Sequence, residues 1–309
     1  MTHDHAAHDH AGHPHGHSHA PADFGRAFVV GIALNTIFVV FEVIYGGLAK
    51  SLALVADAGH NASDVLGLLL AWGAYLAARR RPSQKHTYGL RRGSILASLT
   101  NAVLLLVALG AIIWEAIHRF SQPAPVAGGT VIWVATLGIA VNGVTASLFA
   151  SGRKGDLNLR GAYQHMFADA LVSAGVVVAG VVILFTGWNW LDPLVSLLLA
   201  AVILYGTWGL LRESLDLALD AVPEGVDLNG VKAFLSAQPD VTGIHDLHIW
   251  GMSTTETALT VHLVVPGGLA DERLQHLRHE LHGQFGVAHA TVQIEQGRVP
   301  CDLLSDEVV

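Results

Sequence analysis

Two segments of the chain place a histidine and an aspartate four residues apart. ADAGHNASD contains His60 and Asp64, and YQHMFAD contains His165 and Asp169. On an α-helix, residues four apart lie on one face, so each segment would present an imidazole and a carboxylate in the same direction. Together the two faces would supply two nitrogen and two oxygen ligands. This set suits a tetrahedral Zn²⁺, and two carboxylates balance its charge.

The segments that carry these pairs are long and apolar. The 309 residues are 52% hydrophobic and only 14% charged, whereas soluble domains are usually about a quarter charged. Spans of about 20 apolar residues cross a membrane as helices, because lipid leaves unpaired backbone groups unsatisfied. We therefore predict an α-helical membrane protein with a transmembrane domain over residues 24–215. Its six helices are expected at 26–49, 52–78, 93–118, 129–150, 161–187 and 191–212.

The loops indicate the orientation of these helices. Lys and Arg gather in the loops after the second and fourth spans, at 79–92 and 153–160. Basic loops stay in the cytoplasm, so both termini are expected there, in a multi-pass protein of the cell (inner) membrane. Trp188 and Trp190 then fall at the outer interface.

Depth in the membrane constrains the metal site. In this topology His60 lies near the outer end of its span and His165 near the inner end of its own. The two side chains can meet only if the fifth helix is tilted or begins earlier than its apolar residues indicate. Residues 156–162 could supply that extension.

The structural alternative for these residues is packing. A lone histidine in a helix is more often a packed or interfacial residue than a ligand. Ionisable groups within lipid are costly and usually functional, however, and two copies on separate helices are hard to explain as packing. The pairs therefore favour a metal site. Most other polar residues of the spans are expected to hydrogen-bond between helices, and Asp57 and Asn61 are candidates to line a pathway.

The two ends of the chain differ from the apolar centre. Residues 1–23 hold eight of the 19 histidines, have no apolar face and are expected to be disordered. This tail either collects metal near an entrance or is dispensable. Residues 216–297 show the pattern of a small α+β domain, and 298–309 are expected to form a flexible tail. Helices are expected at 227–237 and 270–285, and strands at 243–251, 257–265 and 288–296.

The stretches SLALVADAGHNASDVLGLLLAW and GAYQHMFADALVSAGV resemble the second and fifth helices of the cation diffusion facilitator family. The six helices, the histidine-rich end and the C-terminal α+β domain are also similar, so the resemblance covers about residues 24–297. It implies proton-coupled efflux of a divalent metal by a homodimer. The C-terminal domain would have a ferredoxin-like, metallochaperone-like fold and regulate transport. The His-Asp pairs on both helices resemble those of zinc-transporting members.

The resemblance also implies a cytoplasmic metal site at His245, His262 and Glu295. This chain has Gln293 where some relatives have a further histidine. Cys301 or His289 could complete the site, and scattered surface histidines are the alternative. A solvated helix face accounts for His276, His279 and His282. In the loop KHTYGLRRG, the family's second histidine is replaced by Leu90, so His86 is expected to be a surface residue.

The residues give this activity a chemical basis. Metal ligands must be deprotonated, so Zn²⁺ and protons compete for them, and an ordinary histidine titrates at a pKa of about 6.5. Metal would load from the cytoplasm, the helices would rock, and protons from outside would replace it.

Other functions predict different features. A membrane-embedded zinc enzyme needs an open coordination position and a general base, but the chain has no His-Glu-x-x-His and the four ligands leave no evident opening. A metal sensor would show no flux. Lys and Arg are too few to indicate nucleic acid, and a single cysteine excludes an internal disulfide. The ligands would also suit Co²⁺ and Ni²⁺. The sequence does not decide whether Cd²⁺ is carried as well.

Overall fold

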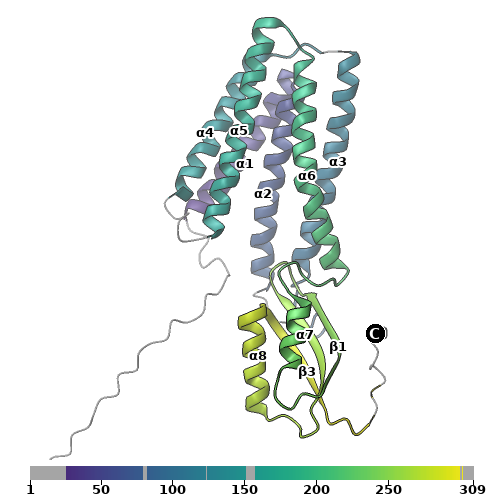
Figure 1. The fold of residues 1–309 in the computed structure, drawn as a ribbon. Helices are drawn as coiled ribbons and strands as arrows, with labels where there is room; N and C mark the ends of the chain where they lie inside the picture. The colour runs from purple at the N-terminus through teal and green to yellow at the C-terminus, as the bar shows by residue number, and fades with distance from the viewer. Residues whose placement is uncertain (1–25, 79–81, 123, 151–156, 300, 302–309) are drawn as a thin grey trace, which may run out of the picture.

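The computed structural model describes residues 26–78, 82–122, 124–150, 157–299 and 301. The predictions for the histidine-rich tail and for nearly all of the C-terminal tail lie outside these residues. Within them, six long helices are followed by a small α+β domain (Figure 1). The long helices are α1 (Arg26–Ala49), α2 (Leu52–Ala78), α3 (Gly93–Ser121), α4 (Gly128–Ala150), α5 (Leu157–Thr186) and α6 (Leu191–Ala218).

The long helices have the character of membrane spans. Over the described residues, α1, α3, α4, α5 and α6 each contain a stretch that is long and apolar enough to cross a membrane. Large apolar side chains cover the outside of the bundle, as lipid-facing residues should: Trp133 is 78% exposed, Phe185 82% and Tyr205 88%. The helix α2 is equally long but is not in this set, because polar residues between Asp57 and Asp64 interrupt its apolar sequence.

The polar helix α2 lies inside the bundle. It packs against α1, α3 and α6 and also touches α4 and α5. The closest neighbours of α5 and α3 are α4 and α6, respectively. In Figure 1, α4 and α5 end higher than α2, α3 and α6, which continue down to the C-terminal domain.

Three helix boundaries differ from those predicted by three residues or more, and one of them is the end of the third helix, which continues to Ser121 instead of 118. The fifth helix begins at Leu157, four residues before its apolar run. This start lies within residues 156–162, the polar stretch expected to be able to extend the helix. The sixth helix continues to Ala218, beyond the predicted end at 212. Its last turns carry Arg212, Glu213 and Asp216, so a hydropathy pattern ends before the helix does.

A buried carboxylate fixes the start of α2. Asp192 of α6 is 1% exposed and accepts hydrogen bonds from Ser51 Oγ at 2.5 Å and from the backbone nitrogen of Leu52 at 2.7 Å. Acceptors at a helix N-terminus satisfy backbone N–H groups that have no partner within the helix. This contact joins α2 to α6 at the end of the bundle that is remote from the C-terminal domain.

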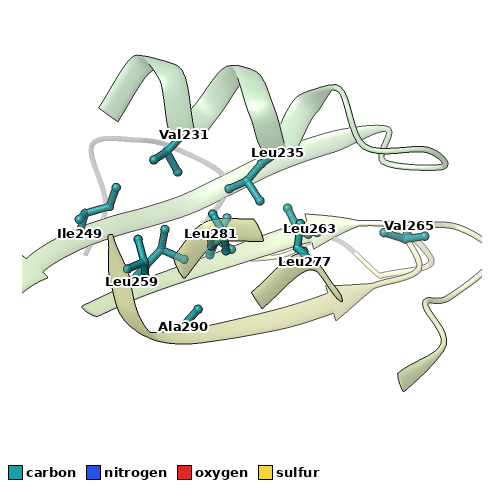
Figure 2. Close-up of a cluster of buried hydrophobic side chains, with 11 residues drawn as sticks. Val231, Leu235, Ile249, Leu259, Leu263, Val265, Leu277, Leu281 and Ala290 are labelled. Atoms are coloured by element: carbon teal, nitrogen blue, oxygen red, sulfur yellow. The ribbon is translucent and has the colours of Figure 1, made fainter. Parts of the chain in front are cut away.

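The C-terminal domain is a three-stranded sheet with helices packed against it. Its elements are α7 (Leu228–Ser236), β1 (Gly243–Gly251), β2 (Thr257–Val264), α8 (Asp271–Phe285) and β3 (Val287–Glu295). The strand order is β1-β2-β3, with β1 antiparallel and β3 parallel to β2, because α8 carries the chain across between β2 and β3. Figure 2 shows Val231 and Leu235 of α7 and Leu281 of α8 in the core against β1 and β2. The fold class is therefore confirmed, including the α+β domain.

Polar contacts join the two parts of the chain. Arg91, which precedes α3, pairs with Glu256 at 2.6 Å, and Arg92 pairs with Asp220 beyond α6. The backbone nitrogen of Thr254 donates to Ser94 Oγ at 3.1 Å. The turn between β1 and β2 thus rests on the start of α3.

Candidate metal centres

The two His-x-x-x-Asp pairs meet between α2 and α5. His60 Nε2 lies 3.7 Å from Asp64 Oδ2 on its own helix and 3.4 Å from Asp169 Oδ1 on the other. His165 Nε2 lies 3.1 Å from Asp64 Oδ2 across the helices and 3.7 Å from Asp169 Oδ2. Each histidine therefore stands between two carboxylates. One ligand atom from each residue lies within 4.8 Å of all the others.

These separations match a tetrahedral zinc site. Zinc bonds to nitrogen and oxygen are about 2.0–2.1 Å long, so adjacent ligand atoms of a tetrahedron lie about 3.3 Å apart. The four nearest-neighbour distances scatter around that value. Oδ2 of Asp64 and Oδ2 of Asp169 are also buried without a hydrogen-bond partner in the described structure. Buried acceptors normally have a partner, and a cation would supply one.

The offset between α2 and α5 brings these side chains to the same depth. His60 lies eight residues from the start of α2, and His165 lies eight residues from the start of α5. The helices run in opposite directions, so these positions coincide only because the first turns of α5 lie beside the middle of α2. The fifth helix thus begins earlier than its apolar residues indicate, which is one of the two conditions under which His60 and His165 were expected to meet.

A cavity of about 350 Å³ borders this cluster. Asp64 and His165 line it, whereas His60 and Asp169 do not. Most of its other lining residues come from the halves of the helices that face the C-terminal domain, whereas Asn61 and Ser63 lie just before the middle of α2. Several of the lining residues are polar: Asn35, Asn61, Ser63, Asn101 and Thr145. Asp169 is 3% exposed, so the cluster has an accessible side and a closed side.

Other polar groups of the helices behave largely as predicted. Asn61 donates to Glu42 of α1 at 3.1 Å, and Asn101 of α3 donates to Ser63 of α2 at 3.2 Å. These hydrogen bonds run between helices. Asn61 also lines the cavity, whereas Asp57 does not.

A second cluster lies on the sheet of the C-terminal domain. His245 Nε2 is 3.3 Å from Glu295 Oε2, and His262 Nδ1 is 3.1 Å from Glu295 Oε1 and 3.8 Å from Cys301 Sγ. These four residues come from three neighbouring strands and the segment after them, and their ligand atoms lie within 4.8 Å of one another. His245 Nε2 is buried without a hydrogen-bond partner in the described residues. The donor set therefore fits zinc.

Strand register explains this second cluster. His245 of β1 is paired with His262 of β2, and His262 is paired with Gln293 of β3. Glu295 follows Gln293 on the same face, because side chains alternate along a strand. Gln293 donates a hydrogen bond to Glu295 Oε1 at 3.0 Å. It therefore positions this carboxylate and is not itself one of the four candidate ligands. Burial raises the pKa of Glu295, but hydrogen bonds from Gln293 and Cys301 and the charges of the two histidines together hold it below its ordinary value.

Sequence reasoning missed Asp246. Its Oδ2 lies 3.3 Å from His262 Nε2, on the ring edge opposite the cluster, and its Oδ1 lies 2.9 Å from His248. A carboxylate in this position orients a ligating histidine and fixes its tautomer. Asp246 reaches it through a bulge in β1, where its φ is +52°. The segment HDLH contained the residue, but regular alternation would not reveal the bulge.

The remaining histidines lie elsewhere. His289 packs edge-on against Tyr88, with ring centroids 5.7 Å apart, and is not part of the cluster that includes Cys301. His86 is exposed in the loop before α3. The exposed side chains of His276, His279 and His282 follow one face of α8, in agreement with a solvated surface.

Comparison with known proteins identifies the class. A family model for the cation efflux transmembrane domain matches residues 28–217, and one for the cation efflux protein cytoplasmic domain matches 223–297. The metal cation efflux system protein CzcD of Cupriavidus metallidurans is 37% identical over 290 residues, which are 93% of this chain and 91% of that protein. The zinc transporter ZitB of Escherichia coli is 36% identical over 282 residues, 90% of each chain. The cadmium, cobalt and zinc/H(+)-K(+) antiporter of Bacillus subtilis is 34% identical over 286 residues, 91% of this chain and 92% of that protein.

The matched family and the relatives show that this multi-pass helical protein is a membrane transporter of metal cations and not an enzyme. The chain belongs to the cation diffusion facilitator family, as its sequence motifs had indicated.

Proposed function

We propose that this protein exports Zn²⁺ from the cytoplasm across the inner membrane in exchange for protons, and that it works as a homodimer. His60, Asp64, His165 and Asp169 hold the transported ion. The observation that carries the proposal is the convergence of these four ligand atoms, two from α2 and two from α5, at tetrahedral spacing. The names of the relatives above, a zinc transporter and a zinc antiporter, agree with it.

The donor set favours zinc over harder cations. Mg²⁺ and Ca²⁺ prefer six or more oxygen ligands, whereas two imidazoles with two carboxylates suit Zn²⁺. Two carboxylates also make the loaded site nearly neutral, which lowers the cost of placing a divalent ion within a membrane. Co²⁺ and Cd²⁺, which appear in the names of relatives, are tested as competing substrates.

Access from one side supports the direction of transport. Asp64 and His165 border the cavity on the side of the C-terminal domain, and the basic loops place that domain in the cytoplasm. Metal therefore enters from the cytoplasm in this conformation. Because the same side chains bind either protons or metal, protons that arrive from the other side release the ion. The cluster at His245, His262, Glu295 and Cys301 binds zinc as a regulatory site.

A proteoliposome assay tests the proposal. Purified protein is reconstituted, a pH gradient is imposed, and zinc movement is followed with a zinc-sensitive dye. The wild type should transport zinc when the pH gradient is imposed, whereas His60→Ala and Asp169→Ala should not. His276→Ala, which removes an exposed histidine of α8, is the matched control and should behave as wild type. Full activity of either site variant would refute the ligand assignment, and a wild type without flux would favour a sensor.

A further inference from the structure

Two acidic side chains lie against each other inside the helix bundle. Glu42 of α1 is 0% exposed and Asp57 of α2 is 1% exposed, and their carboxyl groups are within hydrogen-bonding distance. Asn61 donates to Glu42 Oε2 at 3.1 Å, and Ser173 of α5 donates to Asp57 Oδ2 at 3.3 Å. No Lys or Arg within the described residues forms an ion pair with either acid.

This pair must hold a proton. Ionised carboxylates only accept hydrogen bonds, so a hydrogen bond between two carboxyl groups requires a proton on one of them. Two adjacent carboxylates in a medium of low dielectric constant do not both ionise. Apart from Asp57, the other oxygen of Glu42, Oε1, has no hydrogen-bond donor in the described structure. A structural contact between α1 and α2 would be built more cheaply from neutral amides or hydroxyls, and buried acids in membranes are usually functional.

The position of the pair relates it to transport. Asp57 precedes His60 by about one helical turn, and Ser173 follows Asp169 by about one turn. The cavity lies on the other side of the four ligands, and neither acid lines it. The pair therefore lies between the ligands and the end of the bundle remote from the C-terminal domain. In the proposed orientation, a proton from outside meets Glu42 and Asp57 before it meets the metal ligands.

We propose that Glu42 and Asp57 form a proton-binding site separate from the metal ligands, and that proton binding at this site and zinc binding at the ligands weaken each other. This inference rests on the proposed zinc/proton exchange. The charges that act on the pair are His60 on α2 and Asp169 on α5, and α4, which packs on α1, carries no titratable side chain. Zinc that loads from the cytoplasm brings positive charge close to the pair and drives its proton into the cavity. A proton from outside then restores the pair and weakens the hold on zinc.

The experiment separates zinc movement from its coupling to protons. In proteoliposomes, radioactive zinc exchange at equal pH requires no net proton movement, whereas zinc accumulation against its gradient requires a pH gradient. Glu42→Gln keeps a hydrogen-bonding side chain of the same shape but cannot exchange a proton. We expect its zinc exchange to stay within about twofold of wild type and its gradient-driven accumulation to fall at least about tenfold. Asp57→Asn should show the same split.

Glu115→Gln is the matched control. Glu115 also lies on a membrane helix, but it pairs with Arg119 at 2.9 Å, so this variant should keep both activities. Retention of both activities in Glu42→Gln and Asp57→Asn would overturn the inference. An equal loss of both activities in monodisperse protein would also overturn it, because the pair would then have only a structural role. A wild type inactive in both assays would instead refute zinc transport itself.

Discussion

A close approach between α4 and α5 at Gly128 predicts a strong effect of one methyl group. A Cβ atom on Gly128 would lie 2.9 Å from the carbonyl oxygen of Gly180 and 3.1 Å from the backbone nitrogen of Leu184. Both are main-chain atoms of α5, which cannot rotate away as a side chain could. Small residues allow such close helix packing in membranes. Gly128→Ala therefore forces α5, which carries His165 and Asp169, away from α4.

The size of the effect follows from two opposing terms. Overpacking a well-packed interface costs about 1–3 kcal/mol. Alanine in place of glycine within a helix recovers up to about 1 kcal/mol, and less at the first helical position, where Gly128 stands. A net loss of about 1–2 kcal/mol remains, which for a domain of this size lowers the thermal midpoint by about 2–8 °C.

Thermal unfolding of the detergent-purified protein measures this loss. Gly129→Ala is the matched control, because it adds the same methyl group one residue later on α4, where no atom lies within 4 Å. Gly129→Ala should match or slightly exceed the wild-type midpoint. Equal midpoints for Gly128→Ala and Gly129→Ala would refute the close packing of α4 and α5 described above.

Two further changes probe the C-terminal domain. In protein carrying Asp169→Ala, zinc at about a hundred times its dissociation constant should stabilise the cytoplasmic cluster by about 2.7 kcal/mol. Excess chelator should reverse this shift in thermal midpoint, Glu295→Gln should abolish it, and His289→Ala should leave it intact; a shift that survives Glu295→Gln would contradict the assignment. Arg91→Glu should loosen the contact with Glu256, by up to about 1 kcal/mol for the lost pair plus the new repulsion. Hydrogen exchange at residues 253–256 should rise in Arg91→Glu and return toward wild type in Arg91→Glu/Glu256→Arg; unchanged exchange in the single variant would count against the contact.

The apolar runs of the sequence predicted the helices well, and their errors have a common cause. Hydropathy marks where a helix meets lipid, whereas a helix ends where its backbone hydrogen bonds end. The polar extensions at Leu157 of α5 and at Ala218 of α6 lie outside the apolar runs, so their length could not be read from composition. The helix α2 shows the opposite case. Its polar residues lower its hydropathy although the helix is as long as the others, and its position inside the bundle tolerates them.

The sites were predictable within a helix but not between helices. Spacing of four residues placed His60 beside Asp64 and His165 beside Asp169. Their convergence depends on how far α5 is displaced along α2, which is a property of packing. The pairing of Glu42 with Asp57 depends in the same way on the register of α1 and α2. In the sheet, the family resemblance indicated His245, His262 and Glu295, whereas Asp246 was missed because a bulge interrupts the regular alternation of β1.

The packing of the helices also suits the proposed transport site, which must both hold an ion and release it. The ligands come from two helices whose main partners are different, since α5 packs chiefly on α4 whereas α2 packs chiefly on α1 and α3. Contacts between α2 and α5 are few, so an ion bound at the proposed site would add substantially to the attraction between these two helices. The ion-bearing side chains repel each other less when zinc neutralises Asp64 and Asp169, and protonation of the same carboxylates reduces the repulsion without linking the helices. In the proposed mechanism, zinc and protons would therefore favour different placements of α5 against α2, which is the differential binding that a conformational change requires.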